Sequence, residues 1–257
     1  MIGRLLNRRA PAGLRGRSIS TLGKRVYAIG DIHGRADLLE DLLARIEADH
    51  FARGEAPVQL IFLGDLVDRG PDSAKVVKRL MQIRREHEDT HFLMGNHEEV
   101  FLLALEGNME ALRLFDRIGG RQTMQSYGIS DHALMRADFE ELSGILAEHI
   151  PQDHVDFLAG FEDLIVVGDY AFVHAGIDPR KPLAEQSKGD LRWIRTRFLD
   201  HRQPFEKVIV HGHTITPEVD WRPNRIGIDT GAFVSGTLTA LGLEGEERWL
   251  LQAQASA

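Results

Sequence analysis

Residues 58–70 read VQLIFLGDLVDRG, an apolar run that ends in a glycine-rich turn with Asp65, Asp68 and Arg69. A short apolar run bounded by a turn is typical of a buried strand. A Pro-Asp pair follows, and apolar side chains then recur at helical spacing over residues 76–83. Strand, turn and helix in this order indicate an α/β fold.

The same unit occurs on both sides of this stretch. Residues 26–34 read VYAIGDIHG and residues 91–98 read HFLMGNHE, and a helical pattern follows each of them. Because the carboxyl ends of neighbouring strands in an open α/β sheet converge on one crevice, we expect the three turns to meet in space. A single Gly-Asp pair is more often a loop or a helix cap, but three polar turns at three strand ends indicate a functional site.

Two further strand ends carry histidine, FVHAG at residues 172–176 and HGHT at residues 211–214. Neutral imidazole and carboxylate groups are ligands for zinc, manganese and iron, and the chain has no cysteine for a thiolate site. The sequence therefore predicts a metal site built from nitrogen and oxygen donors. His211 and His213 alternate along a strand end, so they should point to opposite faces and only one can enter the site.

The charge of the 257-residue chain is unevenly distributed. Residues 1–25 hold seven Lys or Arg and no acid, and the rest of the chain has a net charge of −15. A body this acidic repels a polyphosphate backbone, which disfavours general nucleic-acid binding. The absence of cysteine excludes a cysteine nucleophile and fits a cytoplasmic location, and no apolar stretch is long enough to predict a membrane span.

We expect one domain over residues 24–257, preceded by a basic and flexible arm at residues 1–23. Within the domain, residues 107–160 read as a helical insertion or lid, with the clearest helices at residues 139–150 and 152–161. Short apolar runs follow the insertion and predict a second sheet packed on the first. These runs occupy residues 163–167, 170–174, 208–210, 225–228, 237–243 and 248–251.

The motifs GDIHG, GDLVDRG, GNHE, HAG and GHT resemble those of the phosphoprotein phosphatase branch of the calcineurin-like metallophosphoesterases. The similarity covers residues 24–245, including LRWIR at residues 191–195 and IDTGAFVSGTLTAL at residues 228–241. It implies an α/β fold of two packed mixed β-sheets flanked by helices. Met94 replaces an Arg common in this branch and Leu66 a Tyr typical of its eukaryotic members, so the chain is similar to the bacterial and phage-type serine/threonine protein phosphatases.

The resemblance implies two divalent metal ions held by six residues. It assigns Asp31 and His33 to the first metal, Asp65 to a bridge between both, and Asn96, His174 and His213 to the second. Mn²⁺ is the implied ion, with Fe or Zn as alternatives, because a mixed nitrogen and oxygen site discriminates poorly among them. A carboxylate is expected between two dications about 3.5–4 Å apart, and a water shared by both becomes the hydroxide that attacks phosphorus directly.

The resemblance also implies a general acid and a phosphate clamp. His97 is the implied acid that protonates the leaving alkoxide, and Asp68 holds its ring and favours its cationic form. Arg69 and Arg195 are the implied clamp, since a guanidinium matches phosphate oxygens in bidentate fashion.

Two assignments in these motifs have competitors. Arg192 and Arg197 lie in the same motif as Arg195, which is preferred because it stands two residues after Trp193. Glu98 matches the GNHE motif, but we expect it to be a structural partner rather than a metal ligand.

The implied activity is hydrolysis of phosphoserine or phosphothreonine in proteins. The alternative is hydrolysis of dinucleoside polyphosphates such as diadenosine tetraphosphate, because the same metal core serves both. A third possibility, a binding module without activity, is disfavoured because every implied ligand is present together with His97, Asp68 and Arg69. The expected partner is a phosphorylated protein or a nucleotide, and the sequence does not fix an oligomeric state.

Overall fold

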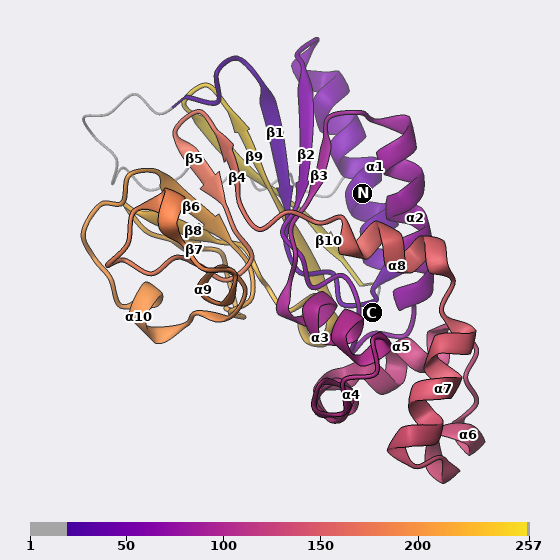
Figure 1. Ribbon diagram of the computed structural model, residues 1–257. Helices are drawn as coiled ribbons and strands as arrows, with labels where there is room; N and C mark the ends of the chain where they lie inside the picture. The colour runs from indigo at the N-terminus through magenta and orange to yellow at the C-terminus, as the bar shows by residue number, and fades with distance from the viewer. Residues whose placement is uncertain (1–19, 256–257) are drawn as a thin grey trace.

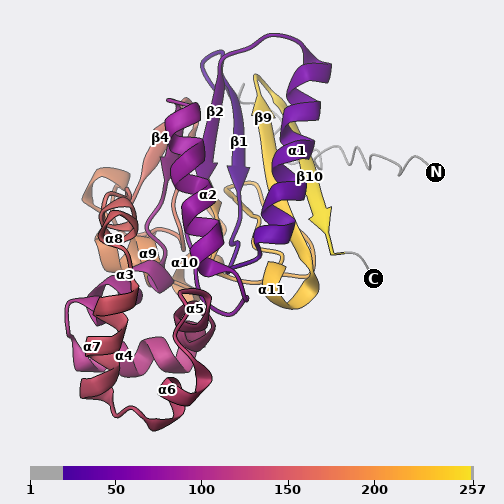
Figure 2. The same cartoon turned by 90° about the vertical axis from the view of Figure 1, so that its right-hand side faces the viewer.

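The computed structural model describes residues 20–255, and the basic arm expected at residues 1–23 lies almost wholly outside the described residues. Two five-stranded β-sheets pack face to face, and helices cover the outer face of each (Figures 1 and 2). Buried apolar side chains from both sheets fill the space between them, among them Val26, Ile61, Phe172, Val210 and Leu241. The predicted α/β fold of two packed mixed sheets flanked by helices is therefore confirmed.

The first sheet has the strand order β10–β9–β1–β2–β3. Strands β1 (Arg25–Ile29), β2 (Val58–Phe62) and β3 (Thr90–Phe92) run parallel, as expected for a repeated strand–turn–helix unit. Helices α1 (Ala36–Arg53) and α2 (Ser73–Glu86) connect these strands and cover the outer face of the sheet (Figure 2). The carboxyl ends of the three parallel strands lie at one edge, and the predicted polar turns follow directly.

The last two strands belong to the first sheet, so their predicted place in the second sheet was wrong. Strand β9 (Thr237–Glu244) is antiparallel to β1, and β10 (Glu247–Gln254) pairs with β9. Strand β9 is buried on both faces, since Leu238 packs toward the helices and Leu241 toward the second sheet. Such a strand needs an interior position in a sheet, and the first sheet offers one between β1 and β10. An apolar run by itself does not show which sheet the strand joins.

The second sheet has the strand order β4–β5–β6–β8–β7. Its strands are β4 (Ile165–Val167), β5 (Tyr170–Phe172), β6 (Val208–His211), β7 (Asp220–Trp221) and β8 (Arg225–Gly227). Strand β7 was not predicted, because two residues are too short to show a periodic pattern. Helices α9 (Lys188–Trp193) and α10 (Thr196–Leu199) pack on the outer face of this sheet (Figure 1).

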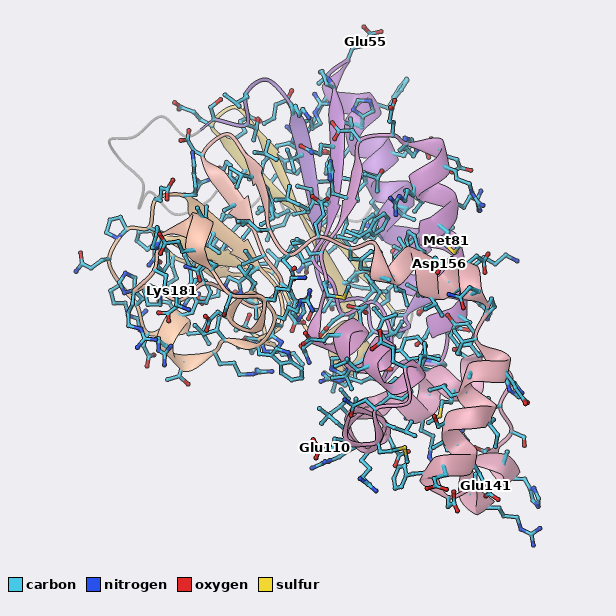
Figure 3. All side chains as sticks on the ribbon, in the orientation of Figure 1. Glu55, Met81, Glu110, Glu141, Asp156 and Lys181 are labelled. Carbon is cyan, nitrogen blue, oxygen red and sulfur yellow. The ribbon has the colours of Figure 1, made fainter. Side chains whose placement is uncertain are left out.

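The segment expected to be an insertion, residues 107–160 and called the insertion below, consists mainly of helices, and helix α3 (Asn96–Leu105) leads into it. It contains α4 (Met109–Phe115), a π-helical turn (Asp116–Gly120), α5 (Arg121–Ser126), α6 (Asp131–Arg136), α7 (Phe139–His149) and α8 (Gln152–Ala159). Helices α7 and α8 confirm the two predicted helices. Helices α4–α7 lie at the end of the first sheet toward which β1 and β2 point (Figure 2), and Glu110 and Glu141 point from them into solvent (Figure 3).

Two short helices complete the described chain, a 3-10 turn (Leu183–Glu185) and α11 (Ala232–Ser235). Within residues 20–255, none of the helices combines the length and the apolar character that a membrane span requires.

Candidate metal centre

The predicted site residues lie in turns with an unusual backbone conformation. Among the described residues, six non-glycine residues have positive φ, and five of them are predicted site residues. These five are His33 (φ 45°), Asp65 (φ 48°), Asp68 (φ 71°), Arg69 (φ 68°) and His213 (φ 64°). Positive φ is strained for residues with a side chain and is held only where the surroundings impose it. The concentration of strain in these turns marks them as a functional region.

Hydrogen bonds between the turns hold this conformation. The backbone N–H groups of Ile32 and His33 donate to the carbonyl oxygen of Asp65, at 3.0 and 2.9 Å. The buried carboxylate of Glu98 accepts N–H groups from Asp65 at 2.8 Å, Leu66 at 2.8 Å and the Gly95 turn at 3.1 Å. Glu98 thus ties the second turn to the third, which agrees with its expected structural role.

Asp65 stands between two groups of possible metal ligands. The ligand atoms of His33, Asp65 and His97 lie within 4.8 Å of one another, and so do those of Asp65, His174 and His213. One carboxylate oxygen of Asp65, Oδ2, is 3.5 Å from His33 Nε2, and the other, Oδ1, is 3.3 Å from His174 Nε2. Asp65 therefore occupies the position that a bridging carboxylate requires.

The second group also contains the Asn96 amide. Its Oδ1 atom lies 2.7 Å from His213 Nδ1 and 3.1 Å from His174 Nε2, so three donor atoms converge. The other nitrogen of His174, Nδ1, donates to the Leu63 carbonyl at 2.8 Å. In the same way His33 Nδ1 donates to the Val67 carbonyl at 2.8 Å. These bonds orient both rings and leave each Nε2 directed at the site, as is usual for metal-binding histidines.

A buried carboxylate oxygen without a partner indicates that the cluster fits cations. Asp31 Oδ1 has no hydrogen-bond partner among residues 20–255, although Asp31 is only 2% exposed. Burial and the neighbouring Asp229 carboxylate raise the pKa of Asp31. An unpaired buried polar atom is costly, and a bound cation would satisfy this one. Carboxylate, imidazole and amide donors suit manganese, iron and zinc alike.

His97 lies at the edge of the cluster and has the expected partner. Its Nδ1 atom is 2.7 Å from Asp68 Oδ2, and its Nε2 atom is 3.0 Å from Nη2 of Arg69. Burial lowers the pKa of His97, but the Asp65 and Asp68 carboxylates outweigh this effect and raise it above the usual value. The ring is thus held by Asp68, with Nε2 facing the guanidinium of Arg69.

The three arginines of the LRWIR segment differ in what they contact. Arg192 is buried between Asp163, at 2.6 Å, and Glu99, at 2.7 Å, and Arg197 pairs with Asp178. Arg195 is exposed and forms no ion pair with the described residues, and its charge acts on His213. Arg195 is therefore the one of the three with a guanidinium available to a phosphate.

The two histidines of the HGHT motif are also distinguished. His213 lies in the second ligand group, whereas His211 packs its ring against Phe198 at a centroid distance of 5.0 Å. Burial lowers the pKa of His211 to about 4, so its ring is neutral inside the protein. The structure places His213 in the cluster and His211 outside it.

Two residues at the site were not identified from the sequence. Asp229 follows β8 and lies close enough to Asp31 to raise its pKa, and burial raises its own pKa to about 6. It belongs to a further strand–Asp–Gly pattern that could have been noticed. Thr123 comes from the insertion and hydrogen-bonds Asp68, and no sequence pattern marks it.

Comparison with known proteins places this geometry in a family. A family model described as calcineurin-like phosphoesterase matches residues 24–234. The chain is 24% identical over 275 residues to a symmetrical bis(5'-nucleosyl)-tetraphosphatase of Nitrosospira multiformis, covering 90% of this chain and 96% of that protein. It is 25% identical over 237 residues to an asymmetrical bis(5'-nucleosyl)-tetraphosphatase of Oceanobacillus iheyensis, covering 84% and 87%.

Solved structures show the same fold. A crystal structure provisionally assigned as a diadenosine tetraphosphatase aligns with a TM-score of 0.62 at 21% identity, over 93% of this chain and 100% of that one. The family match spans every predicted site residue, and the structure gathers five of them, His33, Asp65, His97, His174 and His213, into two adjoining buried groups of possible metal ligands. The chain therefore belongs to the calcineurin-like phosphoesterase family and is a metal-dependent phosphoric ester hydrolase.

Proposed function

We propose that the cluster around Asp65 binds two divalent cations, with Asp31 and His33 on one side and Asn96, His174 and His213 on the other. The observation that carries the proposal is the position of Asp65, whose two carboxylate oxygens face separate imidazoles at 3.5 and 3.3 Å. When bound, a cation pair supplies charge neutralisation at phosphate oxygens and lowers the pKa of water. By resemblance the ion is Mn²⁺, with Fe or Zn as alternatives.

The chain's own residues bind the phosphate and move one proton. Arg69 and Arg195 orient the phosphoryl group through charge-assisted hydrogen bonds. Water attacks phosphorus directly, and the bond between phosphorus and the leaving oxygen breaks. The leaving oxygen takes the proton held at His97 Nε2, which leaves a neutral imidazole, and Asp68 keeps the ring in place at 2.7 Å.

The substrate that this geometry supports best is a phosphomonoester of an alkyl alcohol, such as phosphoserine or phosphothreonine in a protein. An alkoxide is a poor leaving group, so the buried pair of His97 and Asp68 has its greatest effect on such substrates. The clamp also suits one phosphoryl group, because Arg192 and Arg197 are already paired with carboxylates.

A second candidate substrate is a dinucleoside tetraphosphate. Both relatives described above are named as tetraphosphatases, and the symmetrical one is matched over 96% of its length. The cation cluster would serve this reaction equally well. The leaving group is then a nucleotide phosphate, which needs less help from a general acid.

One preparation assayed with three substrates distinguishes the candidates. A phosphoserine peptide, p-nitrophenyl phosphate and diadenosine tetraphosphate would be compared by kcat/KM after metal removal and reloading with Mn²⁺, Zn²⁺ or Fe²⁺. We expect activity to need added metal and the phosphopeptide to be turned over efficiently. A clear preference for diadenosine tetraphosphate would favour the second candidate, and its products, two ADP or AMP with ATP, would identify the bond that is cleaved.

Loss of metal dependence would contradict the proposal as a whole. The same would follow if the chain, loaded with each metal in turn, hydrolysed none of the three substrates.

A further inference from the structure

The insertion contributes directly to the turn that carries Asp68 and Arg69. Helix α5 places Thr123 against Asp68, 55 residues away in sequence, and both side chains are fully buried. Thr123 Oγ1 donates to Asp68 Oδ1 at 2.6 Å and accepts the backbone N–H of Asp68 at 2.8 Å. One hydroxyl therefore fixes both the backbone and the carboxylate of Asp68.

The protons of this cluster can be assigned. The Asp68 carboxylate only accepts when ionised, so the single proton of the Thr123 hydroxyl is directed to Oδ1. Ser73 Oγ lies 2.9 Å from Thr123 Oγ1 and must then donate to it, while it also accepts the Asp68 N–H at 3.1 Å. The other carboxylate oxygen, Oδ2, remains for His97 Nδ1 at 2.7 Å. Thr123 thus holds Asp68 in the rotamer that the His97 ring requires.

The insertion also forms hydrogen bonds with Arg69 in the same turn. The Arg69 backbone N–H donates to the Gly119 carbonyl at 3.0 Å, and its side-chain Nε donates to the Ile118 carbonyl at 3.4 Å. Asp68 and Arg69 both have positive φ, a conformation that isolated residues of these types avoid. Contacts from the insertion therefore compensate the strain of this turn.

We infer that Thr123 is a positioning residue for protonation of the leaving group, through which the insertion completes the active site. Thr123 does not touch the substrate. It acts by fixing Asp68, which fixes the His97 ring with Nε2 toward the leaving oxygen. The inference rests on the acid role that the proposed function gives to His97.

The test compares a poor and a good leaving group on the same protein sample. Thr123→Val keeps the shape of the side chain and removes the hydroxyl. We expect it to lower kcat for an alkyl phosphate such as phosphoserine about tenfold or more, the value of a hydrogen bond to a charged group, and to change kcat for p-nitrophenyl phosphate little. The quantity compared is the ratio of kcat for the alkyl phosphate to kcat for p-nitrophenyl phosphate. This ratio does not depend on the fraction of folded enzyme, so partial unfolding of the variant cannot imitate the result.

Two further variants separate positioning from packing. Thr123→Ser restores the hydroxyl and should return the ratio to that of the unaltered protein. Ser126→Ala removes a contact of the same helix that does not reach Asp68, because Ser126 Oγ accepts the Ala74 N–H at 3.0 Å and donates to the Thr123 carbonyl at 2.7 Å. This variant should leave the ratio unchanged.

His97→Ala shows which idea fails. If His97→Ala lowers the ratio and Thr123→Val slows both substrates equally, the positioning role is wrong and the proposed function stands. If His97→Ala itself slows both substrates equally, the acid role is wrong and the inference falls with it. A ratio lowered by Thr123→Val and restored by Thr123→Ser supports the inference.

Discussion

Three helices of the insertion begin with a side chain that caps the backbone, whereas the helices that follow the site turns begin without one. Asn108, Ser130 and Asp138 accept hydrogen bonds from the first N–H groups of α4, α6 and α7. Helices α1, α2 and α3 have no side-chain cap. The turns ahead of α1 and α2 also contain the strained residues His33 and Asp65.

This difference shows where the conformational preference of the local sequence decides the structure and where contacts from other segments override it. In helices α4, α6 and α7 of the insertion, the cap residues preferred at helix starts agree with the fold, so the first turn of each is stabilised by its own sequence. In the site turns, the side chains at the strand ends are directed at a shared point, and hydrogen bonds from other turns hold them there. Substitutions in the site turns should therefore mainly reduce activity, whereas substitutions at the helix caps of the insertion should mainly reduce stability.

The largest effect is expected at Asp65. Asp65→Asn removes the charge shared by the two ligand groups, so a pair of cations would lose several kcal/mol of stabilisation and activity should fall about 10⁴-fold. Elemental analysis should show fewer than two metal ions per chain. Asp72→Asn, in the same loop but paired with Lys75, is the control and should keep both. Two bound metals in Asp65→Asn would contradict the bridging role.

A smaller and substrate-dependent effect is expected at His97. His97→Ala should keep metal binding and slow alkyl phosphates by roughly 10²–10⁴-fold, with much less effect on p-nitrophenyl phosphate. His91→Ala is the control, because within residues 20–255 the ion pairs of His91 are with Asp89 and Glu162 and not with the cluster. An unchanged rate with an alkyl phosphate would remove His97 from the acid role.

Gly119 lies in the insertion but resembles the site turns, because its backbone has positive φ and packs against a site residue, Arg69. It has φ +116°, and an added Cβ would lie 2.7 Å from Arg69 Cγ and 2.8 Å from Arg69 N. Gly119→Ala should displace Arg69 and raise KM for a phosphomonoester about tenfold, the value of one charge-assisted hydrogen bond.

Gly128→Ala is the matched control for this contact. Gly128 also has positive φ, +91°, but apart from its chain neighbours no atom of the described residues lies within 4 Å of an added Cβ. It should cost about 1–3 kcal/mol of stability and leave KM unchanged. Equal changes of KM in both variants would show that backbone strain, rather than contact with Arg69, is responsible.

The smallest effect on activity is expected at a helix cap. Asp138 accepts the N–H groups of Glu140 and Glu141, both at 2.9 Å. Asp138→Ala should cost about 1 kcal/mol and lower Tm by about 2–4 °C, with kcat unchanged. Glu140→Ala, which removes a first-turn acid without removing the cap, should shift Tm less. A fall in kcat without a fall in Tm would mean that the insertion affects catalysis through α7.

The sequence by itself determined the local units and most of the site residues. The strand, turn and helix units around GDIHG, GDLVDRG and GNHE were readable because apolar periodicity and glycine-rich turns are local properties. The same turns contain Asp31, His33, Asp65 and Asn96, so these residues could be predicted to meet. The helices at residues 139–150 and 152–161 were predictable for the same reason, since their apolar stripes lie within the segments.

Only the tertiary structure decided how these units combine. The place of β9 depends on burial of both its faces, which requires β1 and β10 as neighbours. The availability of Arg195 depends on carboxylates that occupy Arg192 and Arg197, and these come from distant segments. Thr123 has no local pattern, because its function is a single hydrogen bond to a residue 55 positions away. Contacts between segments that are distant in sequence leave no periodic trace in the chain, so they become visible only when the chain is folded.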